Sequence, residues 1–384
     1  MVATMAAPDS SMPPRRGPLW KRILKWVALS VLALILLLVI AGFAYNTIEQ
    51  HADAQRFPQQ GKSFQLGPEF GNVSLNIDCS GQGSPTVILD SGLGVPAVGW
   101  KFVQPGVAKF TRVCFYDRAG YGWSTAGPMP RTSAEIVKEL HALLAAAGEK
   151  PPYILVGHSF GGYNVRVFSG AYPNDVAGMV LVDASHEDQE KRMPQALIDY
   201  SNKQQASSRW QALLQPALID LGIARLMTNT SQPSALPKSF LEELRYLQLQ
   251  TKFLDATASE FAVFPTISAD EVRASGNLGD KPLIVLTAGR APNPAALPPG
   301  FPTKAFDDFE IIWRNDLQVR EAHLSTRGRQ IIVPDSDHMI PFERPDTIVS
   351  AIHEVFAAVN ASSPASAAAV SSSAHEHPSA HDRP

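Results

Sequence analysis

Cysteine and charge are both scarce in this chain of 384 residues, which has two cysteines, Cys79 and Cys114. Two cysteines are too few for a disulfide-rich scaffold or for a zinc site built from thiolates. Charged residues make up 18% of the chain and the formal net charge is −3, so no strong positive field is available to bind a nucleic acid. No repeat of roughly 20–50 residues is visible, which argues against a solenoid or a propeller. Hydrophobic residues nevertheless make up 45%, which excludes a wholly disordered chain.

One long hydrophobic run, WVALSVLALILLLVIAGFAY, occupies residues 26–45 without a charged residue. A helix rising about 1.5 Å per residue covers about 30 Å over this run, the thickness of a bilayer's hydrocarbon core. Acidic Glu49 and Asp53 follow the run, and five basic residues precede it: Arg15, Arg16, Lys21, Arg22 and Lys25. The positive-inside rule therefore predicts one transmembrane signal-anchor helix, with residues 1–25 in the cytoplasm and the remaining chain on the periplasmic or extracellular side. The alternative is a signal peptide cleaved after Ala44.

Composition divides the chain after this run into three parts. We expect residues 46–61 to be a spacer and residues 62–360 to be the folded domain. Residues 361–384 are rich in Ala, Ser, Pro and His and have no periodic apolar face, so we expect a disordered tail. Three histidines of this tail offer weak metal binding as an alternative to a simply solvated segment: His375, His377 and His381.

Short apolar runs that end in turn residues predict the strands of a sheet. Most are nearly continuous β-branched or leucine stretches, as is typical of strands covered on both faces. Helical patterns lie between them, for example one that begins at Thr132 and ends at Gly148. This alternation indicates an α/β fold with a parallel sheet and right-handed crossovers. The runs are residues 73–80, 86–92, 112–120, 153–159, 179–185, 282–289 and 330–336.

The longest interval between two of these runs extends from about residue 187 to residue 280. It contains two amphipathic helical patterns. Ligands of open α/β sheets bind beyond the carboxyl ends of the strands, where long insertions commonly shape the site. The interval therefore predicts a helical lid over that edge of the sheet.

A chemical motif begins within the run at residues 153–159. Residues 157–161 read Gly-His-Ser-Phe-Gly and match G-x-S-x-G, between a strand and an expected helix, which is the context this motif requires. The turn at Ser159 has to be sharp, and the small residues beside it let the backbone pass close to its neighbours. This geometry presents the Ser159 hydroxyl above the sheet as a nucleophile. A glycine-rich turn with an idle serine is the alternative.

Over roughly residues 70–357 the chain resembles the α/β-hydrolase superfamily. The resemblance implies a mostly parallel eight-stranded sheet with the lid between strands 6 and 7. It also implies a catalytic triad in the order nucleophile, acid, histidine, which Ser159, Asp183 and His338 follow. The motifs that carry it are LDSGLG (89–94), YDRAGYGWS (116–124), VGHSFGG (156–162), VLVDASHED (180–188) and DSDHMIPFERP (335–345).

The resemblance assigns His338, in the turn after the final strand, as the base that takes the serine proton. His158 is expected to point away from the nucleophile. The acid is assigned to Asp183, at the end of the strand after the nucleophile strand, because the turn after the penultimate strand has no carboxylate. Glu187, Asp188 and a carboxylate from residues 307–321 remain as alternatives.

The resemblance also implies two backbone donors and a disulfide. The amides of Phe160, after the nucleophile, and of Leu93, in the SGLG turn, are expected to form the oxyanion hole. The family's strand order 1-2-4-3-5-6-7-8 makes the strands of Cys79 and Cys114 neighbours. Because an exported domain meets an oxidising compartment, we predict a Cys79–Cys114 disulfide, with two buried free thiols as the alternative.

The function expected from these assignments is that of a membrane-tethered, exported serine hydrolase. It would cleave small-molecule carboxylic esters or related acyl substrates through an acyl-enzyme, without a metal or an organic cofactor. Asp117 and Arg118 are expected to be structural. The alternatives are other chemistries of the same fold (aminopeptidase, thioesterase, carbon–carbon hydrolase or cofactor-free haloperoxidase) and a binding module without catalysis. The sequence makes no prediction of the oligomeric state.

Overall fold

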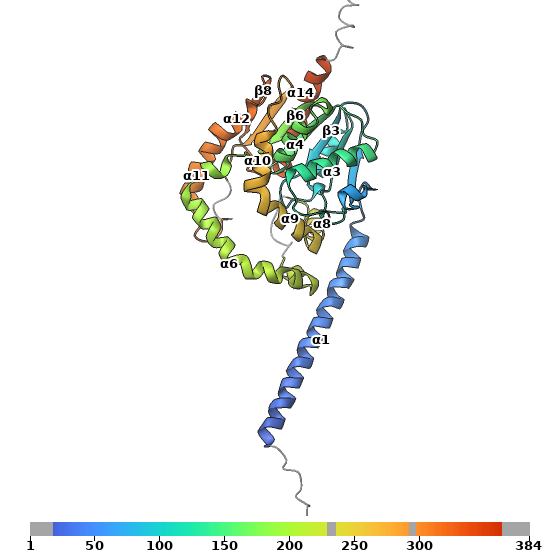
Figure 1. The fold of residues 1–384 in the computed structure, drawn as a ribbon, viewed down its shortest axis with the longest axis vertical. Coiled ribbons are helices and arrows are strands. Elements are labelled where there is room, and N and C mark those ends of the chain that lie inside the picture. Colours follow the sequence, from blue (N-terminus) through green and yellow to red (C-terminus); the bar gives the residue numbers. More distant parts are fainter. Residues whose placement is uncertain (1–17, 229–235, 292–296, 363–384) are drawn as a thin grey trace, which may run out of the picture.

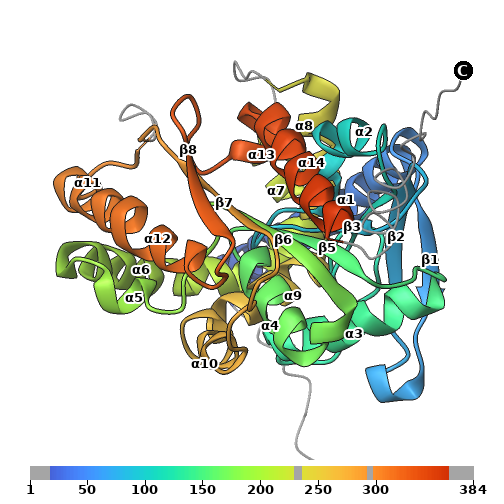
Figure 2. The same ribbon diagram turned by 90° about the horizontal axis from the view of Figure 1, so that it is seen from above.

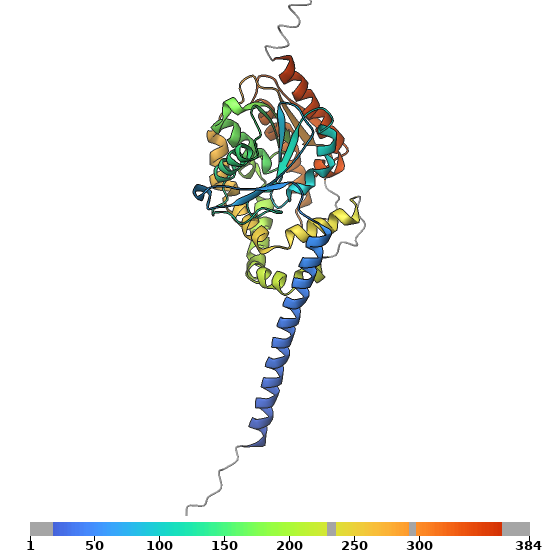
Figure 3. The ribbon, with the colours of Figure 1, turned by 90° about the vertical axis from the view of Figure 1, so that its right-hand side faces the viewer.

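The computed structural model of the protein describes residues 18–228, 236–291 and 297–362, apart from the side chains of residues 205–213. Within these ranges a long N-terminal helix projects from one end of an α/β domain (Figures 1 and 3). Of the cytoplasmic segment expected at residues 1–25, residues 1–17 lie outside the described residues, as do residues 363–384 of the tail expected at 361–384. The described part of the first segment belongs to the long helix from Leu19 onward.

One eight-stranded sheet forms the centre of the domain, in the order β1-β2-β4-β3-β5-β6-β7-β8. β2 runs antiparallel to both β1 and β4, and the other neighbours are parallel. This confirms the predicted mostly parallel sheet and its strand order. β1 was not predicted as an apolar run because it is a short and largely exposed edge strand. The strands are β1 (Lys62–Gln65), β2 (Ser74–Ser80), β3 (Thr86–Asp90), β4 (Val113–Tyr116), β5 (Tyr153–His158), β6 (Val176–Val182), β7 (Leu283–Ala288) and β8 (Gly328–Val333).

Helices cover both faces of the sheet (Figure 2). The bounds of the helices are α1 (Leu19–Arg56), α2 (Gln104–Val107), α3 (Ser133–Ala146), α4 (Gly161–Ala171), α5 (Gln189–Arg192), α6 (Gln195–Asp220), α7 (Ile223–Met227), α8 (Lys238–Gln248), α9 (Thr251–Val263), α10 (Ala269–Ala274), α11 (Thr303–Ile312), α12 (Gln318–Ala322), α13 (Ile340–Glu343) and α14 (Pro345–Ala361). Shorter helical turns are η1 (Pro68–Phe70), η2 (Ala97–Phe102), η3 (Pro173–Asp175), η4 (Phe264–Ser268) and η6 (Trp313–Leu317).

The helices pack on the sheet through two hydrophobic cores, one on each face. In β5, Leu155 packs toward α3 and α4, whereas its neighbours Ile154 and Val156 pack toward α14. Successive strand residues point to opposite faces, so a strand between two cores needs an apolar residue at nearly every position. This explains the continuous apolar runs in the sequence.

The insertion between β6 and β7 contains α5 to α10, which confirms the predicted lid. A buried arginine joins this lid to the sheet. Arg118, after β4, lies 2.9 Å from a carboxylate oxygen of Asp90 on β3 and 2.9 Å from one of Glu260 on α9. Its guanidinium also donates to the backbone carbonyls of Ser91, at 2.7 Å, and Gly92, at 3.1 Å. Arg118 thus holds the loop after β3 and the lid in one arrangement.

The helix α1 is longer than the predicted anchor, because it runs from Leu19 to Arg56 and includes residues 46–56, which were expected to be a spacer. One face of this helical stretch packs against the lid. Asn46 and Asp53 are buried there, and Asp53 pairs with Arg225 of α7. α1 is long and apolar enough to cross a membrane.

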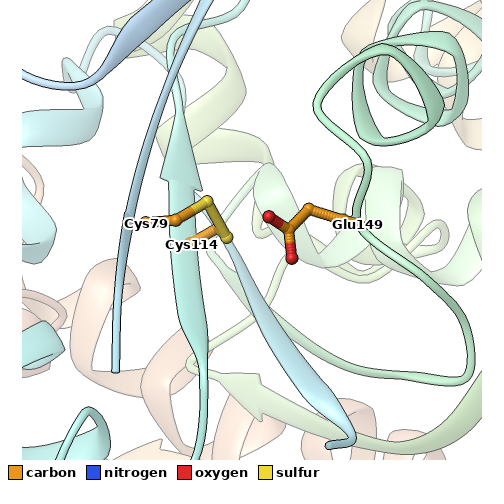
Figure 4. A group of neighbouring side chains, drawn as sticks. All are labelled: Cys79, Cys114 and Glu149. Atoms are coloured by element: carbon orange, nitrogen blue, oxygen red, sulfur yellow. A yellow bond between two sulfur atoms is a disulfide. The ribbon is translucent and has the colours of Figure 1, made fainter. Parts of the chain in front are cut away.

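Cys79 and Cys114 lie directly opposite each other in the antiparallel pair of β2 and β4, with Cα atoms 4.1 Å apart. The structure joins them in a disulfide (Figure 4). Glu149 approaches the bridge, and its carboxylate accepts hydrogen bonds from Arg112 at 2.6 and 2.7 Å. Among the described residues this is the one cluster of three potential metal-ligand side chains, and its bonded sulfurs offer no thiolate.

Replacing Arg118 by Met is predicted to lower the free energy of unfolding by about 3–5 kcal/mol, because Asp90 and Glu260 would stay buried without their cation. The measurement is urea denaturation of the full chain in detergent. The matched control is Arg329→Met, which removes an exposed ion pair with Glu354 and should change the free energy by less than about 1 kcal/mol. Equal midpoints for the two variants would contradict the role given to Arg118.

The disulfide predicts that the denatured full chain has no free thiol before reduction and two after it. Changing both Cys79 and Cys114 to Ala should lower the free energy of unfolding by about 2–4 kcal/mol, because the bridge restricts the unfolded chain. Thiol titration and urea denaturation measure the two effects. Two free thiols in the unreduced protein would show that the bridge does not form.

Candidate active site

Ser159 occupies the turn between β5 and α4, with a φ of +52°. This left-handed conformation is uncommon for a residue with a side chain and marks a sharp turn. The backbone leaves no room beside it, since a Cβ added to Gly157 would lie 2.5 Å from the carbonyl oxygen of Gly161. The first glycine of the motif is therefore required by close backbone approach, and the turn holds Ser159 at the carboxyl edge of the sheet.

A histidine and a carboxylate meet at the same edge. His338 lies between β8 and α13, and its Nδ1 is 2.6 Å from Oδ2 of Asp183, which follows β6. The other oxygen of Asp183 accepts hydrogen bonds from the backbone N–H of Ala288, at 2.9 Å, and from Nε1 of Trp313, at 3.0 Å. Asp183 is buried and, like Ser159, has a positive φ, of +41°. Each of these three hydrogen bonds stabilises the ionised carboxylate.

This pair shifts the pKa of both partners. Burial opposes ionisation of Asp183, but the hydrogen bond and charge of His338 outweigh burial and lower the pKa of the carboxyl. Desolvation likewise opposes the charged form of His338, but the hydrogen bond and charge of Asp183 raise the pKa of the imidazole above its usual 6.5. Proton uptake at His338 is therefore favoured, as a general base requires.

The alternative acids are engaged elsewhere or lie apart from the Nδ1 atom of His338. Glu187 pairs with Arg166 at 2.6 Å. Asp188 pairs with Arg320 at 2.8 Å and with Lys191 at 3.0 Å. In the described residues, Asp183 is the carboxylate hydrogen-bonded to the His338 ring.

A cavity of about 470 Å³ brings Ser159, Asp183 and His338 together. The lid was expected to shape the site, yet α11 and η6, after β7, contribute more residues to this cavity than the lid does. These residues are Phe306, Phe309, Glu310 and Trp313. The lid contributes Gln189, so the first cavity is only partly a product of the insertion.

The lid forms a second cavity of about 580 Å³ that also reaches the serine. Leu93, Ser159 and Phe160 line it from the sheet, and residues of α6, α9 and η4 line it from the lid. Ser159 borders both cavities and so lies where they meet. A substrate bound at Ser159 can therefore place one part in each cavity.

The backbone amides of Leu93 and Phe160 face no protein acceptor within hydrogen-bonding distance among the residues that the structure describes. The loop that carries Leu93 is held by its neighbours, since Arg118 binds the carbonyls before it and the N–H of Gly94 donates to the Tyr121 hydroxyl at 3.1 Å. Two unpaired N–H groups beside a serine are a suitable arrangement for binding a developing negative charge.

His158 contacts the loop that carries His338. Its Nε2 lies 2.9 Å from the backbone carbonyl oxygen of His338, and the two ring centroids are 4.8 Å apart. Burial lowers the pKa of His158 to about 3, so the ring is neutral and donates the Nε2 hydrogen to that carbonyl. His158 thus supports the loop of His338, a role that the sequence did not predict. No sequence signal distinguishes it from the variable position of G-x-S-x-G.

Sequence reasoning also did not single out Trp313 or Glu310. Trp313 is the indole donor to Asp183, and Glu310 lines the first cavity. Burial, followed by the charge of Asp183, raises the pKa of Glu310 to about 7. Both residues lie in an amphipathic segment whose pattern indicates only a helix, so their roles depend on where the segment packs.

Comparisons with known proteins agree with this fold. Residues 87–351 match the model of the alpha/beta hydrolase family. Two curated relatives, YbdG and YqjL, come from Bacillus subtilis (strain 168), and both carry the name uncharacterized protein. The chain is 26% identical to YbdG over 228 residues, which are 59% of this chain and 66% of YbdG. It is 26% identical to YqjL over 279 residues, which are 72% of this chain and 86% of YqjL. The chain thus spans slightly less than two thirds of YbdG.

A solved structure of the epoxide hydrolase CorEH without ligand superposes with a TM-score of 0.55 at 16% identity, covering 78% of this chain and 99% of that one. At this identity the likeness concerns the fold alone. The family match covers most of the chain, and the sheet has the strand order that the family resemblance implied. This chain is therefore a member of the alpha/beta hydrolase family.

Proposed function

We propose that the protein is a serine hydrolase that cleaves carboxylic esters or related acyl compounds through a covalent acyl-enzyme. The observation that carries this proposal is the cavity shared by Ser159 and the hydrogen-bonded pair of His338 and Asp183. A serine that shares a cavity with a histidine, and a buried carboxylate hydrogen-bonded to that histidine, are the parts of an acyl-transfer triad.

The reaction begins when His338 takes the proton of the Ser159 hydroxyl and Oγ attacks the carbonyl carbon of the ester. Asp183 keeps the imidazole hydrogen on Nδ1, which leaves Nε2 free to accept the proton, and it stabilises the imidazolium that forms. The amides of Leu93 and Phe160 bind the oxyanion of the tetrahedral intermediate. Each such donor typically contributes about 3 kcal/mol to transition-state stabilisation.

The intermediate collapses when the carbon–oxygen bond to the alcohol breaks and His338 returns the proton to the departing alcohol. Water, deprotonated by His338, then attacks the acyl-enzyme, and the carboxylic acid leaves as Ser159 regains its proton. The two cavities that meet at Ser159 provide separate space for the acyl and alcohol parts. No step requires a metal or an organic cofactor.

The membrane assignment belongs to the same proposal. α1 crosses the membrane once through residues 26–45, with residues 1–25 in the cytoplasm and the hydrolase domain on the periplasmic or extracellular side. The charge distribution around the apolar run supports this orientation, and the Cys79–Cys114 bridge fits an oxidising compartment. The small-molecule substrate and the membrane are then the partners of the chain, and nucleic acid is not one of them.

The nucleophile assignment predicts that Ser159→Ala abolishes labelling of the full chain by a fluorophosphonate, because the probe needs an activated hydroxyl. The control is Ser350→Ala, which removes an exposed hydroxyl on α14 and should label like the parent. In-gel fluorescence of the detergent-solubilised proteins measures the effect. Equal labelling of Ser159→Ala and the parent would refute the nucleophile, and a parent that neither labels nor turns over an ester panel would favour a binding module.

The raised pKa of His338 predicts a pH profile. The base has to be neutral, so kcat/KM for a p-nitrophenyl ester should fall as the pH drops through an apparent pKa above 6.5. Asp183→Asn removes the charge that raises this pKa, so the acid limb should move to lower pH while kcat falls by about 10⁴-fold. Asp346→Asn, on the surface of α14, is the control and should keep the parent profile. An unchanged limb in Asp183→Asn would exclude Asp183 as the partner of the base.

A further inference from the structure

The transmembrane helix and the lid form one packed unit. Side chains of α1 are exposed from Leu19 to Leu38, and burial begins at Val39. Beyond that point it recurs on one helical face, at Gly42, Asn46 and Asp53. The partners on this face belong to the lid, which reaches α1 with the turn between α6 and α7 (Figures 1 and 3).

The contacts give the position of the lid along α1. A Cβ added to Gly42 would lie 2.9 Å from the carbonyl oxygen of Leu221, and one added to Gly222 would lie 2.7 Å from the Tyr45 ring. Gly42 and Tyr45 are at the end of the apolar run 26–45. Three residues of helix rise about 4.5 Å, so the lid touches α1 within one turn of the place where the apolar run stops.

Large apolar side chains are exposed on the lid at this level, beside the partly exposed Asp220. We call residues 214–228 the lid corner. Exposed side chains of the lid corner include Leu214 at 57%, Leu226 at 71% and Met227 at 74%. Its one basic residue, Arg225, is buried against Asp53 and so presents no charge to the outside. Exposed large apolar side chains grouped in this way mark a contact with a membrane or another protein.

The helix α6 connects the second cavity to the lid corner. Ile198, Ser201 and Asn202, near the start of α6, line this cavity together with Phe261 of α9. The Phe261 side chain is 61% exposed. From the cavity, α6 continues for about 18 Å to the lid corner, on the side of the domain from which α1 projects (Figure 1).

We propose that the lid corner is immersed in the outer interface of the bilayer, and that Ser159 hydrolyses acyl esters that partition into the bilayer and enter through the second cavity. The proposal rests on the serine hydrolase function proposed above and names its substrate class. A bilayer is the occupant of the apolar surface because the surface continues the apolar run of α1 at the level where that run ends. Transfer of these Leu and Met side chains from water into the interface would make a favourable hydrophobic contribution to the free energy of membrane binding.

The first test measures depth in the membrane. The full chain carrying Met227→Cys is labelled with a polarity-sensitive fluorophore and reconstituted in phosphatidylcholine vesicles, and the matched control carries Ile332→Cys. Ile332 is 41% exposed on β8, away from α1 (Figure 1). Because Cys79 and Cys114 are joined, the introduced thiol is the one that reacts without reductant.

The proposal expects spin-labelled lipid to quench the probe at residue 227 at least about threefold more than the probe at residue 332, and iodide in the water to show the reverse order. Equal quenching at the two positions, or a probe at residue 227 that is open to iodide, would overturn membrane contact of the lid corner.

The second test separates the substrate class from the chemistry. Vesicle-embedded dioleoylglycerol and water-soluble p-nitrophenyl acetate are offered to the reconstituted parent and to a variant with Leu226→Ser and Met227→Ser. The variant should lose about tenfold in hydrolysis of the embedded ester and keep its activity on the soluble ester. Ile332→Ser is the control and should keep both activities.

The outcomes distinguish the two proposals. Two results would overturn the inference and leave the serine hydrolase proposal intact. One is hydrolysis of the soluble ester without hydrolysis of the embedded ester. The other is hydrolysis of the embedded ester at a rate that the lid-corner substitutions do not change. Absence of both activities together with absence of fluorophosphonate labelling would overturn the proposed function and the substrate class with it, while the quenching experiment would still decide the membrane contact.

Discussion

The hydrogen bond between Asp183 and His338 is the interaction on which the arrangement of the site depends. It links the loop after β6 to the loop after β8. The second oxygen of Asp183 accepts hydrogen bonds from the end of β7 and from the indole of Trp313. Four segments that are distant in the sequence therefore meet at one buried carboxylate. Burying a charge raises the free energy of the folded state unless hydrogen-bond donors compensate for the lost water. The surrounding segments therefore have to be placed so that their donors reach the Asp183 carboxylate.

The serine joins this centre through the sheet. β5 and β6 are parallel neighbours, so the residues that follow them, Ser159 and Asp183, leave the sheet at the same edge. Both have positive φ values, and the Ser159 N–H donates to the carbonyl of Val182 at 3.2 Å. Strained turns at this edge are supported by the rigid strands below them. The same principle extends to the lid, which Arg118 ties to the loop of Leu93, and from the lid to α1 through Asp53 and Arg225.

Much of this could be predicted from the sequence, because short-range patterns carry strong physical signals. Continuous apolar runs predicted seven of the strands, a motif with glycines at forced positions placed Ser159, and the resemblance carried by five motifs placed His338, Asp183 and the strand order. Other elements gave no such signal. β1 is an exposed edge strand, residues 46–56 have too few apolar residues to suggest that they continue a membrane helix, and His158 occupies a variable position of its motif.

Residue types and their spacing are enough to predict the class of fold, the apolar length of the N-terminal helix and the groups that could do acyl-transfer chemistry, since each of these is a local property. The packing of the chain is needed to know that α11 and η6 contribute more residues to the first cavity than the lid does, that Glu310 and Trp313 face the site, and that the lid meets α1 where its apolar run ends. These facts depend on how segments far apart in the chain pack against one another, and an amphipathic pattern shows that a helix has an apolar face without showing what that face will cover.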